Sequence, residues 1–134
     1  MRQTVKTKVL DAAVASATSL KTNIKSFLYP TIVVTTSGTV DGTLVVQGAL
    51  KDTADTYDID FGAPASVTNP WFYVDVYPLN NSSSGPIVGS TGIALSTAGT
   101  TAYVINADEL DEVAVTLTRT DGTFTVWIAG ATNQ

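Results

Sequence analysis

The sequence predicts an all-β fold: a single antiparallel β-sandwich or jelly-roll-like barrel with an N-terminal arm. Runs rich in Val, Ile, Thr and aromatic residues, which favour strands, recur from Tyr29 to the end of the chain. Turn pairs such as Asp41-Gly42 and Asp121-Gly122 punctuate these runs, and no convincing helical pattern follows residue 27. A length of 134 residues fits one domain.

The last third of the chain shows the clearest alternation. Residues 113–120 and 123–130 each place apolar side chains at every second position, as a half-buried strand does. Asp121-Gly122 stands between the two runs, and this pair favours a type I′ turn, so we expect a β-hairpin there. The side chains expected to point inward are Val113, Val115, Leu117, Phe124, Val126 and Ile128.

Earlier strands are expected in four places. The run at 29–38 is β-branched and ends at Ser37-Gly38, and the next run, 41–50, begins with its own turn pair. Residues 56–62 alternate between apolar and acidic side chains, and the run at 71–79 is stopped by Pro78. The sequence "NNSSSGP" at 80–86 is expected to be a polar loop.

The N-terminal segment, residues 1–27, is expected to be an arm, extended or partly helical, preceding a β-sandwich domain at 28–134. Apolar residues at 10, 13, 14 and 17 have helical spacing, but the Ser and Thr content favours an extended chain. The segment holds five of the seven basic residues and only one of the twelve acids. A basic arm beside an acidic body predicts docking on an acidic protein surface, with no nucleic-acid partner. Its expected contact residues are Arg2, Lys6 and Lys8.

The composition excludes much chemistry. The chain has no His and no Cys, so a Ser-His-Asp triad, a thiol nucleophile and a zinc site built on those ligands cannot form. Nucleophile motifs and phosphate loops are also missing, and we therefore expect no enzyme and no cofactor. No apolar run has the length needed to span a bilayer, so no membrane partner is expected. The start of the chain only faintly resembles a signal peptide, because Asp11 interrupts it.

The aromatic run at 71–77 is the first candidate site. On a regular strand Trp71, Tyr73, Asp75 and Tyr77 share one face. Such a face could stack sugar rings while the carboxylate accepts hydrogen bonds from hydroxyl groups. It could equally be a subunit interface, where Tyr and Trp are enriched, and this second interpretation is favoured.

Two acidic clusters are further candidates. The first could supply oxygen ligands to Ca²⁺, but its spacing does not match an EF-hand loop, and solvated side chains are expected. Its members are Asp52, Asp55, Asp58 and Asp60. The second could pair carboxylates for glycoside hydrolysis, but its residues are adjacent in sequence, and a solvated connection is expected. Its members are Asp108, Glu109, Asp111 and Glu112.

Several segments together resemble the small β-sandwich structural proteins of tailed bacteriophages, of the capsid decoration (cement) type. These segments are "LDAAVASATSL", "YPTIVVTTSGTVDGTLVVQGAL", the strand after "NPW", and "INADELDEVAVTLTRTDGTFTVWIAGA". In that group the chain commonly ends with a polar turn, a Val-rich strand, a glycine turn and a last Val-rich strand. The basic arm and the 80–86 loop depart from the group and leave a head-fibre, tail or connector role open.

The resemblance implies a virion component present in many copies. It implies a homo-oligomeric protein that binds the major capsid protein, or other virion subunits, and stabilises the head shell without an active site. The alternative is a carbohydrate- or receptor-binding β-sandwich module of a tail, head fibre or surface protein.

Overall fold

A computed structural model describes residues 2–19, 21–49, 71–79, 85–106 and 110–133. The described residues form strands and their connections, and none of them is helical. No helix in these ranges is therefore long and apolar enough to cross a membrane. The predicted all-β class is confirmed.

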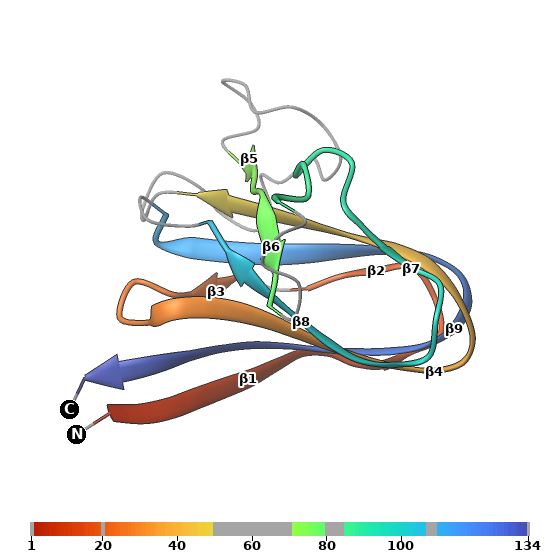
Figure 1. Ribbon diagram of the computed structural model, residues 1–134, viewed down its shortest axis with the longest axis horizontal. Helices are drawn as coiled ribbons and strands as arrows, with labels where there is room; N and C mark the ends of the chain where they lie inside the picture. The colour runs from red at the N-terminus through yellow and green to blue at the C-terminus, as the bar shows by residue number, and fades with distance from the viewer. Residues whose placement is uncertain (1, 20, 50–70, 80–84, 107–109, 134) are drawn as a thin grey trace.

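Within the described residues, nine strands pair in one hydrogen-bonded sheet (Figure 1). Two of them, β4 and β9, are 22 residues long and pair with each other antiparallel along their lengths. The strands are β1 (Arg2–Ala13), β2 (Ala17–Thr18), β3 (Thr22–Asn23), β4 (Leu28–Ala49), β5 (Phe72–Tyr73), β6 (Val76–Pro78), β7 (Ile93–Leu95), β8 (Gly99–Ile105) and β9 (Glu112–Asn133).

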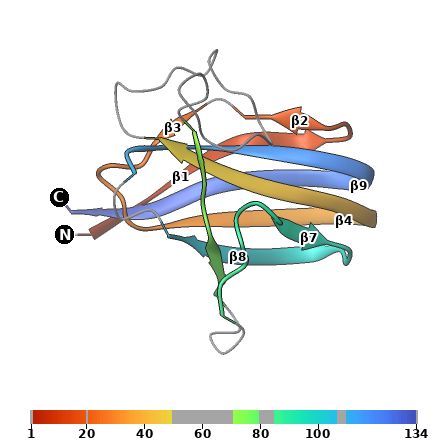
Figure 2. The same ribbon diagram turned by 90° about the horizontal axis from the view of Figure 1, so that it is seen from above.

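The sheet is folded across its middle, so that one sheet supplies both layers of a sandwich (Figures 1 and 2). In the first layer the order is β1, the second half of β9, the first half of β4, β8 and β6. In the second layer β2 and β3 flank the first half of β9, and β5 and β7 flank the second half of β4. The folded edge lies on the right of Figure 1, and both chain ends lie on the left.

Four chain segments pass from one layer to the other at this folded edge, and each carries a residue with positive φ near the crossing. These residues are Ala12 (φ 49°), Gly38 (φ 82°), Gly99 (φ 144°) and Gly122 (φ 94°), and we call this folded edge the bend. Glycine adopts such angles without a steric penalty, so three of the four segments turn at little cost. The opposite edge of the sandwich, where β4 begins and β8 ends, is the open end.

The predicted hairpin at Asp121-Gly122 is wrong. Residues 123–131 pair with the first half of β4 and residues 112–121 pair with its second half, so both runs belong to the single strand β9. The positive φ of Gly122 bends a continuous strand and does not reverse it. A Cβ atom there would lie 3.0 Å from the carbonyl oxygen of Thr39, so β4 packs directly on the bend. For the same reason the expected break between 29–38 and 41–50 is a register shift within β4.

The core fills the space between the layers. Each of the six side chains that alternation predicted to point inward, at 113, 115, 117, 124, 126 and 128, is at most 1% exposed. They pack with the inward residues of β4, among them Ile32, Val34, Leu44 and Val46. Burying this apolar set between two layers is what holds the folded sheet closed.

The N-terminal segment lies along β9 through both layers. Residues of β1 pair with the second half of β9, and Ala17–Thr18 and Thr22–Asn23 pair with the first half. Of the two conformations left open for this segment, β1 is extended. The expected strand at 56–62 and the larger part of the 80–86 loop lie outside the described residues.

Candidate functional site

The aromatic run at 71–77 does not form one face. Trp71 is 0% exposed and belongs to a small buried cluster with Ala49 and Ala114, so it is a core residue. The run is divided between layers, because β5 pairs with β4 while β6 pairs with β8. Passing from one layer to the other breaks the strict alternation that the sequence implied, and Phe72 becomes an exposed residue instead.

The remaining members of that run have different surroundings. Tyr73 is half-buried, and Tyr77 is exposed on β6 opposite Val104. Asp75 accepts a hydrogen bond from the Gly89 backbone N–H through its carboxylate (2.8 Å), and its carbonyl oxygen accepts one from Asn106 N–H (3.0 Å). Asp75 therefore joins the start of β6 to the β6–β7 connection and to the end of β8.

The lysines of β1 meet a tryptophan on β9. Lys6 Nζ lies 4.2 Å from the centroid of the Trp127 ring, and Lys8 Nζ lies 5.8 Å from it. Both distances are within the range of a cation–π attraction. Lys8 Nζ also lies 3.5 Å from the carboxylate of Asp11. We call Lys6, Lys8 and Trp127 the Lys–Trp cluster; Arg2, the third predicted contact residue, pairs through its backbone with Asn133.

This cluster borders the outer face of the first layer, a surface of small apolar and threonine side chains. Two rows of cross-strand neighbours run away from it: Lys8, Trp127, Val33 and Ala102, and then Lys6, Ala129, Thr31, Val104 and Tyr77. A third row is polar, since the Thr35 and Thr100 hydroxyls lie 3.1 Å apart in a hydrogen bond. The face combines an apolar centre with positive charge at one edge.

Trp127 is the member of the Lys–Trp cluster that the sequence interpretation missed. Because Val126 and Ile128 point inward, alternation already requires Trp127 to point outward. Its place beside Lys6 and Lys8 depends on the pairing of β1 with β9, which the sequence did not reveal.

The acidic residues in the described ranges do not form a metal site: Glu112 has a structural role, and the others do not gather as ligands. Glu112, expected to be solvated, is 7% exposed, and its carboxylate lies 3.1 Å from Lys21 Nζ. It is buried because β9 begins there and pairs with β3. In the described ranges no three His, Cys, Asp or Glu residues gather as metal ligands do. The candidate calcium residues at 52–60, and Asp108 and Glu109, lie outside those ranges.

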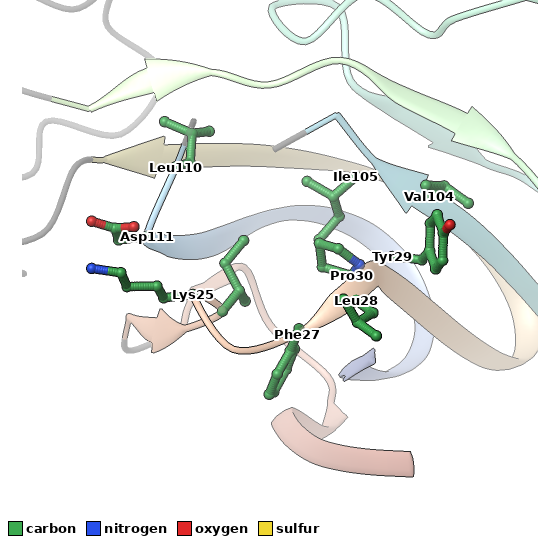
Figure 3. A pocket seen from close by; sticks show the side chains of 10 residues that line it. Lys25, Phe27, Leu28, Tyr29, Pro30, Val104, Ile105, Leu110 and Asp111 are labelled. Atoms are coloured by element: carbon green, nitrogen blue, oxygen red, sulfur yellow. The ribbon is translucent and has the colours of Figure 1, made fainter. Parts of the chain in front are cut away.

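A pocket of about 520 Å³ opens at the open end of the sandwich (Figure 3). Its walls are the turn at 24–27, the start of β4 at 28–30, the end of β8 at 104–105, and residues 110–111. In the turn, Phe27 N–H donates to the carbonyl oxygen of Ile24 (2.9 Å), and Lys25 N–H donates to the Asn23 side chain (3.0 Å). Eight of the ten lining residues are apolar or aromatic, and the other two are Lys25, which is cationic, and Asp111, which carries a carboxylate.

Tyr29 stands at this pocket in an unusual backbone conformation. Its φ is +54°, and Ala12 is the only other described non-glycine residue with a positive value. Residues before proline normally avoid helical regions. Beside Pro30 the conformation of Tyr29 therefore has two energetic costs, the positive φ of a non-glycine residue and the crowding by the proline ring. The Thr31 hydroxyl donates to the Tyr29 carbonyl oxygen (2.9 Å) and holds it in place. The side chain is 73% exposed, and Figure 3 shows its ring beside Val104.

No protein-family model matches the sequence, and no curated protein matches it. Among solved structures, the crystal structure of the SPBc2 prophage-derived protein YomS is similar to this chain. The TM-score is 0.65 at 9% sequence identity, and the match covers 98% of this chain and 96% of that chain. At this identity the likeness shows a shared fold.

Proposed function

We propose that this chain is a non-enzymatic structural protein of a bacteriophage particle. Its finer role in this proposal is that of a capsid decoration protein, which binds the major capsid protein and stabilises the head shell. Support comes from the segments that resemble phage structural proteins and from the likeness in fold, over nearly the whole chain, to a prophage-derived protein.

The observation that carries the proposal is the outer face of the first layer. An apolar centre with Trp127 at its edge is the composition that protein interfaces favour, since buried aromatic anchors supply much of the binding free energy. Lys6 and Lys8 project from β1, an edge strand of the sheet, and favour an acidic partner. Charged lysines on an edge strand also oppose unwanted pairing with other strands.

The proposed action is mechanical. A standard interface buries roughly 1,600 Å² in total, which is enough for specific binding without any chemistry. When many copies attach to one lattice or form homo-oligomers, the linked contacts hold far more strongly than one contact does. No histidine or cysteine is needed for this action, and the chain has neither.

The test is co-sedimentation with empty head shells of the phage or prophage that encodes the chain. The double variant Lys6→Glu/Lys8→Glu should bind shells at least about tenfold more weakly, because both charges then repel an acidic partner. Binding of the wild-type protein should also weaken as salt is raised.

Lys25→Glu is the matched control, since Lys25 is an exposed lysine of the pocket and not of the outer face. It should bind shells within about twofold of the wild-type protein. A wild-type protein that ignores shells at low salt would refute the decoration role. Equal binding by the double variant would refute the part assigned to the Lys–Trp cluster.

A further inference from the structure

The pocket at the open end has features that the proposed shell-binding face does not explain. Its volume of about 520 Å³ lies within the range of small-molecule sites. Its walls come from the start of β4, the end of β8, the residues just before β9 and a turn that is fixed by hydrogen bonds, so it is formed without a partner. It lies at the open end of the sandwich, and Lys6 and Lys8 are not part of its lining.

The strained backbone conformation of Tyr29, together with its exposed ring, indicates that this residue belongs to a binding site. A strained backbone angle persists only where the surrounding structure imposes it, and such angles cluster at binding sites. The strain does not serve burial, because the ring is 73% exposed. It does not serve the bend either, because Tyr29 is at the start of β4, whereas Gly38 of the bend is in the middle of that strand.

The charges of the lining select a class of ligand. Lys25 can donate hydrogen bonds and Asp111 can accept them, and together they give the pocket no excess of either sign. An anion or a cation would gain from one group and be repelled by the other. A neutral ligand with hydroxyl groups and an apolar face can use both groups, and can lay its apolar face on the tyrosine ring.

We infer that this pocket binds a neutral oligosaccharide. The C–H face of one sugar unit stacks on Tyr29, and hydroxyls of a neighbouring unit hydrogen-bond to Lys25 and Asp111, which lie on the other side of the pocket from Tyr29 (Figure 3). The inference goes beyond attachment to the shell, and it places the aromatic sugar contact at Tyr29 and not at the buried Trp71.

The test is a titration of the full chain, followed by NMR, with three neutral trisaccharides: maltotriose, cellotriose and chitotriose. At least one should bind with Kd of about 1 mM, as a single stacked sugar unit would. Tyr29→Asn, which removes the ring but tolerates positive φ, should weaken that binding about fivefold or more. Tyr29→Phe keeps the stacking face and should bind within about twofold of the wild-type protein.

The matched control is Phe72→Asn, because Phe72 is an exposed aromatic residue of β5 in the other layer. It should leave sugar binding unchanged. The inference is overturned if no trisaccharide binds at about 20 mM, or if Tyr29→Asn binds as well as the wild-type protein. It is also overturned if the peptide Leu-Pro-Leu, and no sugar, shifts the resonances around Tyr29, since the pocket is then a peptide site. Shell binding is measured separately, so failure of either proposal leaves the other standing.

Discussion

The bend and the open end of the sandwich use positive φ in opposite ways. At the bend, three of the four positive-φ residues are glycines, and Gly38 and Gly122 lie side by side, with the Cβ position of one 4.0 Å from the Cα of the other. At the open end the positive φ belongs to Tyr29, a large exposed residue before a proline. At the bend the positive φ lets the sheet fold over, whereas at the open end it orients an exposed side chain.

The two ends also each contain a phenylalanine packed on a glycine. Phe124 lies over Gly42 near the bend, and Phe27 lies over Gly130 at the open end; a Cβ on either glycine would come within 2.8 Å of its phenylalanine. Phe124 is fully buried, whereas Phe27 is half-buried and lines the pocket. The bend is closed by packing, and the open end keeps its apolar residues accessible.

The largest expected effect comes from these two phenylalanines. Phe124→Ala should lower the free energy of unfolding by about 4 kcal/mol, because it leaves a cavity in the core. Phe27→Ala removes a side chain that is already partly exposed and should cost about 2 kcal/mol. Urea titrations of both variants measure the difference. Equal losses would mean that the open end is packed as tightly as the bend.

The glycine of the bend should give the next effect. Gly122→Ala must hold alanine at φ +94° and place a Cβ 3.0 Å from the Thr39 carbonyl oxygen, so we expect a loss of about 3 kcal/mol. Gly85→Ala is the control, since its φ is +71° but its Cβ would contact nothing within 4 Å. It should cost only about 1 kcal/mol, the backbone strain alone. If both variants lose the same amount, contact across the bend contributes nothing.

The strands were predictable from the sequence where apolar and polar side chains alternate without interruption. Val113, Leu117, Phe124 and Ile128 lie inward as alternation requires. The Asp121-Gly122 pair misled because local turn chemistry is compatible with either a reversal or a bend. What decided between them is the pairing of β9 with β4 on both sides of Gly122, a long-range property that no local pattern contains.

The contact surfaces were less predictable for a related reason. In β1 a register shift between Lys8 and Leu10 interrupts the alternation of side chains, so the sequence did not predict a strand there. Without its pairing to β9, the meeting of Lys6 with Trp127 could not be foreseen. Tyr29 offered one usable signal, its position before Pro30, but its positive φ depends on the surrounding fold.

A charge pair at the open end should give a smaller effect than the bend glycine. The Glu112 carboxylate is nearly buried beside Lys21 Nζ, which itself is about one-third exposed. Lys21→Met leaves a nearly buried carboxylate without this cation, and we expect a loss of about 2 kcal/mol, moderated by the partial exposure. The double variant Lys21→Met/Glu112→Leu should recover most of that loss, because the buried charge is then gone too. A double variant no more stable than Lys21→Met would show that the ion pair is not the reason for the loss.

The smallest effects test the comparison most directly, because the variants convert into glycine the two non-glycine residues that have positive φ in the described part of the chain. Ala12→Gly and Tyr29→Gly each relieve backbone strain, and each adds flexibility to the unfolded chain that partly offsets the gain. We expect the free energy of unfolding to rise by about 0.5 kcal/mol in each case, measured by urea titration. Ala12→Gly should leave trisaccharide binding unchanged, since Ala12 is not part of the pocket. Tyr29→Gly removes the ring and should weaken trisaccharide binding about fivefold or more, as Tyr29→Asn does. A Tyr29→Gly protein that loses stability would mean that the ring contributes packing, and the case for a residue strained for the sake of a ligand would fail.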